Sequence, residues 1–244
     1  GKKPFVFTAG AFLAYRSMEF IRDDVCFQNL NVKIVGMGSG LSWSSLGPTH
    51  HTTEDISVLR AIPNLMILSP ATPRQVVACV QTAYEHDGPV YIKIGMNHEK
   101  EYFEDNYVHD IKKSDCLREG KNIAVFVTGS ILEEAVKTCE MLEQDGISAK
   151  LINVTTIKPF NEKEVIDIVK EIDKVAVIEE HNIHGGLASI ISETITYNGL
   201  EARVIPIGLN DTFAEGYGTY AMVRKANQLD AINIYRRMKE AYEE

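Results

Sequence analysis

LNVKIVGMGSGLSWSSLGPTHHTTEDISVLRAIPNLMILSPATPRQV, at residues 30–76, is the stretch that decides the fold. A β-branched apolar run at 32–37 predicts a buried strand, and a polar loop rich in Gly and Ser follows at 38–53. A short helix at 54–61 and a second apolar strand at 66–69 come next. This order of elements is typical of a parallel sheet with crossover helices.

The sequence on both sides repeats this alternation of short apolar runs and amphipathic segments. We predict further strands at 5–8, 90–94, 123–127, 149–153, 175–179 and 203–206. We predict further helices at 11–28, 72–86, 131–144, 161–171, 186–197 and 230–243. The strands of the second half are apolar runs, as expected when both faces of a sheet are covered. The right-handed crossover rule then gives open, doubly wound sheets.

The periodicity fails between residues 95 and 120, where the chain is charged and holds scattered aromatic residues. We interpret this stretch as a linker that crosses the surface. The fold class is therefore α/β, with two doubly wound, mainly parallel sheets. We predict a first domain at 1–97, a linker at 98–121 and a second domain at 122–244. The chain begins just before an apolar strand and without Met, so we expect the first domain to be incomplete at its N-terminus.

The overall composition narrows the class of partner. The chain has 244 residues and a formal net charge of -9, which argues against nucleic acid or an anionic membrane as the main partner. No apolar run approaches the roughly 18 residues that a membrane span needs. The cysteines are widely spaced without a CxxC pair, which favours reduced thiols and a cytoplasmic location.

The loop at 38–53 is the best candidate for chemistry, because ligands bind beyond the carboxyl ends of strands in open α/β sheets. It is long and rich in Gly, and it contains His50 and His51. No Gly-Lys-Ser/Thr follows, so it is not a P-loop. Either histidine is a candidate acid, base or substrate-binding group, and a histidine held only by backbone hydrogen bonds is the alternative. Metal binding with Glu54 and Asp55 is a weaker interpretation.

An ordered set of motifs resembles the transketolase family over nearly the whole chain, especially its split bacterial and archaeal members. The first half contains GPTH, EDI-x-x-LRAIPN, SPATP and GPVYIK. The second half contains TGS-x-x-x-EA, TIKP and EEH-x-x-x-GGL-x-S. The set is also similar to deoxyxylulose-phosphate synthase and, more distantly, to the beta subunits of pyruvate dehydrogenases.

The resemblance implies thiamine-diphosphate-dependent transfer of a two-carbon ketol unit between ketose and aldose-type carbonyl compounds. The cofactor then lies between two domains, usually of two chains, in a homodimer or an α2β2 heterotetramer. The present domain would hold its pyrimidine. A separate pyrophosphate-binding subunit or domain would hold its diphosphate and Mg²⁺ (or Ca²⁺). A Glu that activates the cofactor is expected upstream of Phe5, outside these 244 residues. This chain alone should therefore not catalyse: either a partner chain and a missing N-terminal piece complete the site, or the sequence is a fragment of a longer protein.

The family's site residues carry over unevenly. Phe12 matches the aromatic residue that stacks on the aminopyrimidine, although a core phenylalanine is the alternative. Tyr15 lies one turn further along, and Arg16 matches an Arg of the split enzymes. His50 matches the histidine that contacts the reacting centre, and we also expect His51 to bind substrate.

Three positions depart from the phosphosugar-binding pattern. The resemblance implies a His at Gly38 and an Arg at Met96 that help to bind the sugar phosphate, and an Asp at Leu46 that reads a hydroxyl next to the carbonyl. Each lost phosphate contact is worth roughly 1.5–3 kcal/mol. We expect Lys93 and His51 to compensate only in part. The hypothesis is that the acceptor is not a simple phosphosugar.

Two rival functions remain open besides that of a deoxyxylulose-phosphate-synthase-like enzyme. One is a 2-oxo-acid decarboxylating component like a dehydrogenase beta subunit, with a lipoyl-bearing partner. The other is a non-catalytic scaffold subunit. In the second half, His181 and His184 precede Gly185-Gly186 in a run that resembles a phosphate cradle, although a packing role is favoured. We interpret 212–220 as a surface loop near an interface.

Overall fold

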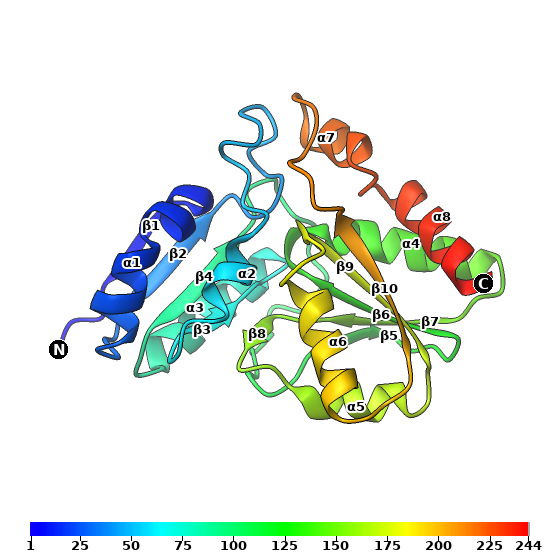
Figure 1. Cartoon of the computed structure of the whole chain (residues 1–244), viewed down its shortest axis with the longest axis horizontal. Coiled ribbons are helices and arrows are strands. Elements are labelled where there is room, and N and C mark those ends of the chain that lie inside the picture. The colour runs from blue at the N-terminus through cyan, green and yellow to red at the C-terminus, as the bar shows by residue number, and fades with distance from the viewer. Residues whose placement is uncertain (244) are drawn as a thin grey trace.

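The computed structural model describes residues 1–243 and contains two five-stranded sheets with helices packed against them (Figure 1). The first part of the chain forms β1 (Phe5–Ala9), η1 (Phe12–Arg16), α1 (Met18–Phe20), η2 (Ile21–Cys26), β2 (Lys33–Met37), α2 (Asp55–Leu59), β3 (Met66–Leu68), α3 (Pro73–Glu85) and β4 (Val90–Ile94). The remainder forms β5 (Asp115–Arg118), β6 (Ile123–Thr128), η3 (Gly129–Ile131), α4 (Leu132–Gln144), β7 (Ala149–Asn153), β8 (Thr156–Lys158), α5 (Glu162–Val169), β9 (Lys174–Asn182), α6 (Leu187–Tyr197), β10 (Arg203–Leu209), α7 (Tyr220–Ala226) and α8 (Ala231–Glu243).

The sheet orders are β1-β2-β4-β3-β8 and β10-β9-β6-β7-β5. All neighbouring strands are parallel except β8 on β3 and β5 on β7, which are antiparallel edge pairs. The predicted fold class is therefore confirmed. Within residues 1–243, no helix combines the length and the apolar character that crossing a membrane requires.

Several elements were missed from the sequence. β8 has three residues and β5 has four, too few for a clear period. β5 also lies inside the segment that we interpreted as a linker, so this segment adds an edge strand to the second sheet. The predicted helix at 11–28 is interrupted, because the π-helical segments η1 and η2 flank α1. The division into domains at 97 and 122 stays a prediction.

One apolar core joins the two sheets. Ile34, Ile67 and Tyr91 of the first sheet belong to the same buried cluster as Phe126 and Val177 of the second. β8 strengthens this connection, because it follows β7 of the second sheet in the chain but pairs with β3 of the first. The shared core and the pairing of β8 with β3 therefore fix the position of one sheet relative to the other, and with it the position of the loops at their carboxyl ends.

We expect Ile157→Ala to lower the free energy of unfolding by about 2–5 kcal/mol, because Ile157 lies in β8 and is 1% exposed within the shared core. Urea unfolding followed by circular dichroism measures the change. Val108→Ala is the control: Val108 is 82% exposed, so its loss should cost about 0.5 kcal/mol or less. Equal effects of the two substitutions would show that β8 adds little to the packing between the sheets.

Candidate functional site

The loop at 38–53 follows β2 and projects beyond the carboxyl ends of the first sheet (Figure 1). Its base is fixed by backbone hydrogen bonds. The amides of Gly38 and Ser39 donate to the carbonyl of Ile94 at 3.0 and 2.8 Å. Gly40 and Thr52 pair across the base as an antiparallel bridge. Both ends of the loop therefore start from the rigid sheet.

Three predicted site residues lie together beside this loop. The rings of Phe12 and His50 meet edge to face, with their centroids 5.0 Å apart at an interplanar angle of 66°. The guanidinium carbon of Arg16 lies 5.4 Å from the centroid of the Phe12 ring. Phe12 is 36% exposed, so part of its ring remains open to a ligand. The site thus combines an aromatic face, a cation and an imidazole.

Tyr15 connects η1 to the start of α2. Its hydroxyl donates to Glu54 Oε2 at 2.7 Å and accepts from the Glu54 amide at 3.0 Å. Burial, and then the carboxylates of Asp55 and Glu54, raise the pKa of Tyr15 far above its ordinary value. The hydroxyl therefore stays protonated and keeps Glu54 in place. Tyr15 lies near the predicted cofactor-binding surface, but its hydroxyl is already hydrogen-bonded to the carboxylate and the amide of Glu54.

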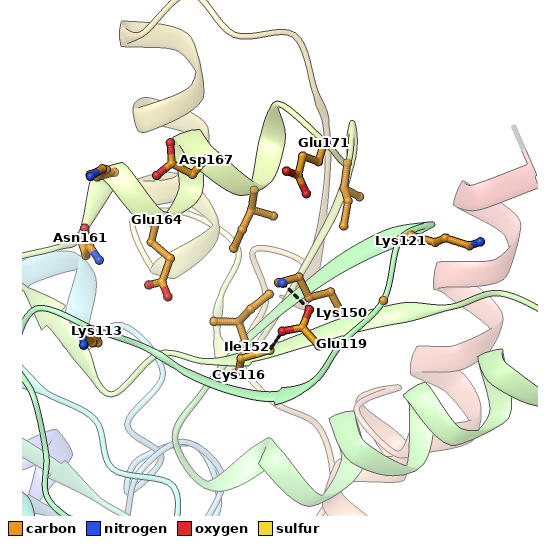
Figure 2. Close-up of a pocket in the computed structure, with 14 residues that line it drawn as sticks. Lys113, Cys116, Glu119, Lys121, Lys150, Ile152, Asn161, Glu164, Asp167 and Glu171 are labelled. Atoms are coloured by element: carbon orange, nitrogen blue, oxygen red, sulfur yellow. Dashed lines mark hydrogen bonds and ion pairs between the residues drawn. The ribbon is translucent and has the colours of Figure 1, made fainter.

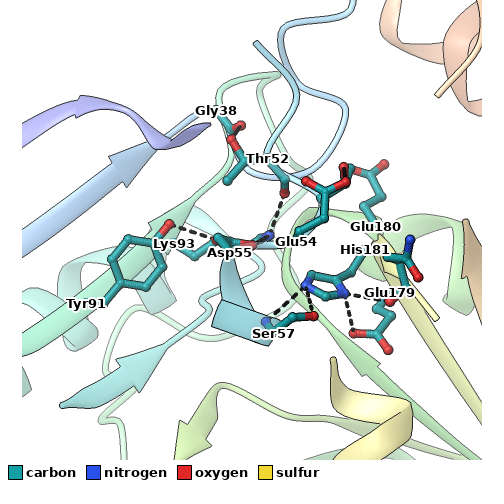
Figure 3. A network of polar contacts seen from close by, with 12 residues as sticks. Gly38, Thr52, Glu54, Asp55, Ser57, Tyr91, Lys93, Glu179, Glu180 and His181 are labelled. Carbon is teal, nitrogen blue, oxygen red and sulfur yellow. Dashed lines mark hydrogen bonds and ion pairs between the residues drawn. The ribbon is translucent and has the colours of Figure 1, made fainter. Parts of the chain in front are cut away.

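A buried ion pair supports the loop from below (Figure 3). The Lys93 ammonium contacts Asp55 and also donates to the Thr52 carbonyl at 2.9 Å. Tyr91 donates to the other oxygen of Asp55 at 2.7 Å, and burial raises the pKa of Tyr91, so it remains a donor. We predicted Lys93 as a substrate ligand. In the structure, however, the Lys93 ammonium is buried in this ion pair and does not face the open side of the loop.

His51 also points inward, in contrast to His50. It is 2% exposed, which leaves no room for the predicted contact with a substrate. Its ring nitrogens form no hydrogen bond of normal geometry, although the Trp43 backbone lies beside the ring. Burial lowers the pKa of His51 more than nearby Glu180 and Glu54 raise it. His51 is therefore a neutral packing residue of the loop.

The three departures from the phosphosugar pattern share an apolar character. Gly38 has a φ of +80°, and a Cβ at this position would lie 2.0 Å from the indole nitrogen of Trp43. Trp43 donates to the Met37 carbonyl at 3.3 Å, so the indole fills the space in which any side chain at position 38 would begin. Leu46 and Met96 are 46% and 45% exposed. Trp43 is a residue that sequence reasoning missed, although it is the single Trp of the chain.

The run around His181 does not form a phosphate cradle. The N-terminus of α6 is occupied by the carboxylate of Glu179, which accepts from the amides of Leu187 and Ala188 at 2.8 and 2.9 Å. His181 is 1% exposed and packs on Ser57 of α2 (Figure 3). The favoured packing role therefore fits the structure, and the cradle interpretation was wrong.

A hollow of about 580 Å³ lies against β5, β7 and α5, away from the loop at 38–53 (Figure 2). Its charged side chains have both signs, and Lys150 forms an ion pair with Glu119 at 2.6 Å. Burial raises the pKa of Cys116 in its wall, which disfavours the reactive thiolate. The side chains that line this hollow do not form a compact group like that of Phe12, Arg16 and His50. Among residues 1–243, no group of three or more His, Cys, Asp or Glu is placed to hold a metal ion.

Both halves of the chain match models of known protein domains. Residues 1–97 match the pyrimidine binding domain of transketolase, and residues 112–234 match the transketolase C-terminal domain. The chain belongs to the transketolase family. One of the subunits of the apulose-4-phosphate transketolase of Actinobacillus succinogenes is 33% identical over 96% of this chain and 75% of that protein. The 6-deoxy-6-sulfo-D-fructose transketolase subunit SqwH of a Clostridium species is 31% identical over 97% of this chain and 76% of that protein.

Solved structures agree with this assignment. A split-gene transketolase, described as an inactive beta4 tetramer, superimposes with a TM-score of 0.91 at 30% identity, over 100% of this chain and 77% of that chain. Transketolase of Campylobacter jejuni has the same fold, with a TM-score of 0.76 at 19% identity over 98% of this chain and 35% of that chain. A 1-deoxy-D-xylulose-5-phosphate synthase of Synechococcus elongatus is 32% identical, but this chain covers only 34% of it. The likeness to that synthase is therefore the lesser one.

His51→Gln should remove part of the acid sensitivity of the fold. The lowered pKa means that unfolded His51 binds a proton near pH 6.5 while the folded side chain stays neutral, so stability falls as the pH drops below about 6.5. Between pH 6.5 and 5.5, the wild type should lose up to about 1 kcal/mol more than the variant. Urea unfolding at several pH values measures this difference, which should be constant between pH 7 and 8. A constant difference down to pH 5.5 would contradict the neutral, buried assignment.

Proposed function

We propose that this chain supplies the pyrimidine side of a thiamine-diphosphate-dependent transketolase-type transferase. The enzyme would move a two-carbon ketol unit between carbonyl compounds of carbohydrate metabolism. The observation that carries the proposal is the joint placement of Phe12, Arg16 and His50 at the open edge of the first sheet. Their position in a domain that matches the family's pyrimidine-binding domain supports it.

The residues present fit the pyrimidine half of the cofactor. A partly exposed aromatic ring offers a stacking face, and Phe12 provides one with Arg16 beside it. When bound, thiamine diphosphate supplies the electron sink for cleavage of a carbon–carbon bond. The described residues provide no metal cluster, so we propose that a partner subunit or domain holds the diphosphate and Mg²⁺. An α2β2 assembly in the cytoplasm is the arrangement that we propose, and the free cysteines favour this location.

His50 is the proposed catalytic residue of this chain. Its amide donates to the Gly47 carbonyl at 2.9 Å, and the Thr49 hydroxyl lies 3.0 Å from its Nδ1. These contacts orient the ring and leave Nε2 available. At that atom the imidazole would hold, donate or accept a proton at an oxygen of the substrate. Phe12 would fix the edge of the same ring.

We also propose that the acceptor is not a simple phosphosugar. Binding of a phosphate requires cations or backbone amides that point at it, whereas Trp43 beside Gly38 and the side chain of Met96 present apolar groups at the two positions where the resemblance implies phosphate contacts. Leu46 stands where the resemblance implies an Asp that reads a substrate hydroxyl. The buried Lys93 does not replace the lost charge. One relative is named for a sugar phosphate, apulose 4-phosphate, and another for a sulfonated sugar, 6-deoxy-6-sulfo-D-fructose, so the proposal rests on the apolar groups of this chain and not on those names.

His50→Ala and Phe12→Ala should separate catalysis from cofactor binding in the enzyme assembled with its pyrophosphate-binding partner. We expect His50→Ala to lower the rate of ketol transfer by about 10²–10⁴ while the Kd of thiamine diphosphate stays within about twofold. Phe12→Ala should raise that Kd by about tenfold, because stacking is lost. Calorimetry and ketol-transfer assays make the two measurements. A His50→Ala enzyme with wild-type turnover would disprove the role of His50.

Met96→Arg should restore a phosphate contact. A guanidinium at this half-exposed position is expected to lower the KM for ribose 5-phosphate by about tenfold, through a charge-assisted hydrogen bond. The KM for glycolaldehyde, which has no phosphate, should not change, and Met96→Leu should behave as the wild type. Steady-state kinetics of the assembled enzyme decide this. A low KM for ribose 5-phosphate in the wild type would contradict the proposed acceptor class.

A further inference from the structure

The carboxyl end of β9 meets the loop at 38–53 rather than solvent. In an open α/β sheet this end is where ligands usually bind. Here the Asn182 amide donates to the Thr53 carbonyl at 2.7 Å, and the Glu180 carboxylate accepts from the Leu41 amide at 3.2 Å. The second sheet therefore binds the backbone of the loop that carries His50.

The Glu180 carboxylate is fixed before it reaches the loop. It is 4% exposed and forms an ion pair with Arg224. Tyr220 donates to Oε2 at 2.6 Å, and Ser130 donates to the same oxygen at 3.3 Å. Arg224 also donates to the Ser130 carbonyl at 2.8 Å, so the guanidinium is held in turn. A charged acceptor with this many partners is rigid.

The loop approaches Glu180 so closely that only glycine fits at one position. Gly40 has a φ of +57°, and a Cβ there would lie 2.4 Å from Oε2 of Glu180. The next amide in the chain is that of Leu41, which makes the hydrogen bond. The contact therefore fixes the direction in which the loop leaves its base.

A second contact holds the tip of the loop. Ser44 donates to the Gly218 carbonyl at 2.9 Å, and the Gly218 amide donates back to the Ser44 carbonyl at 3.3 Å. The ring of Tyr217 lies on Gly47, where a Cβ would be 2.2 Å from its Cε1. Gly47 in turn accepts the hydrogen bond from the amide of His50. The segment before α7 and this loop lie side by side in Figure 1.

We propose that the second domain positions His50, with Glu180 as the inner anchor and the Ser44–Gly218 contact with Tyr217 as the outer one. The first domain holds the base of the loop through Ile94, whereas the inner anchor holds Leu41, directly beyond the base, and the outer anchor holds the tip. The two anchors are then positioning elements for the acceptor side of the site. The functional part of this inference rests on the proposed transferase activity.

Amide hydrogen exchange of the purified chain tests the anchors without catalysis. In the double variant Ser44→Ala/Tyr217→Ala, we expect the amides of Gly47 and His50 to exchange about tenfold faster, because the tip loses its hydrogen bond and its cover. Glu180→Gln should speed exchange at Leu41 in the same way. Amides of β2 should not change, and Phe213→Ala is the control, since Phe213 is a 76% exposed aromatic residue of the same segment.

Kinetics of the assembled enzyme distinguish positioning from general stability. With hydroxypyruvate as donor and glycolaldehyde as acceptor, the Ser44→Ala/Tyr217→Ala enzyme should lose about tenfold in kcat/KM for the acceptor. Its Kd for thiamine diphosphate and its Tm should match the wild type. Tyr217→Phe should retain full activity, because the proposal requires the ring and not the hydroxyl.

Unchanged exchange in both the outer variant and Glu180→Gln would overturn the inference. A parallel loss of cofactor affinity, Tm and turnover would also overturn it, because the contacts would then serve only the fold. In the outer variant, Tyr217 is 66% exposed and Ser44→Ala removes only a hydroxyl group, so this variant keeps the test decisive if Glu180→Gln does not fold. An inactive wild-type assembly would contradict the proposed function alone, since exchange reports on the anchors directly.

Discussion

The hydrogen bond from the Leu41 amide to the Glu180 carboxylate joins the two domains at the point where the chemistry is expected. A loop of this length, rich in Gly, loses much conformational entropy when it is fixed. The bridge between Gly40 and Thr52 fixes only the base, so the residues beyond Gly40 need partners of their own. Glu180, itself held by Arg224 and Tyr220, provides them from the second sheet.

Two buried ion pairs organise the site around this loop. Lys93 and Asp55 form a closed pair that supports the loop from inside the first domain. Glu180 and Arg224 form a pair that reaches out of the second domain toward the loop. Buried ion pairs contribute little net stability but cost much when one partner is lost, so they fix geometry rather than strengthen the fold. This geometry places His50 against Phe12.

The fold and the site were predictable to different degrees. The long apolar runs gave eight strands in the right places, because burial on both faces leaves a continuous signal in the sequence. β5 and β8 lack such a signal, since they are short edge strands whose position depends on pairing with distant residues. His50 was found through the GPTH motif and Phe12 through the resemblance to the transketolase family, and the structure brings their rings into contact. The inward orientation of His51 and Lys93 was not predictable. The sequence does not show which of two adjacent loop histidines faces the core, nor on which face of β4 the Lys93 side chain finds its partner.

The central claim is that this chain forms the pyrimidine side of a thiamine-diphosphate site. The most direct test is calorimetric titration of thiamine diphosphate, with Mg²⁺ present, into the chain alone, its pyrophosphate-binding partner alone and the assembly of the two. The account predicts tight, saturable binding only to the assembly, at one cofactor per copy of this chain. Absence of binding to the assembly would contradict it and leave the scaffold function as the remaining one.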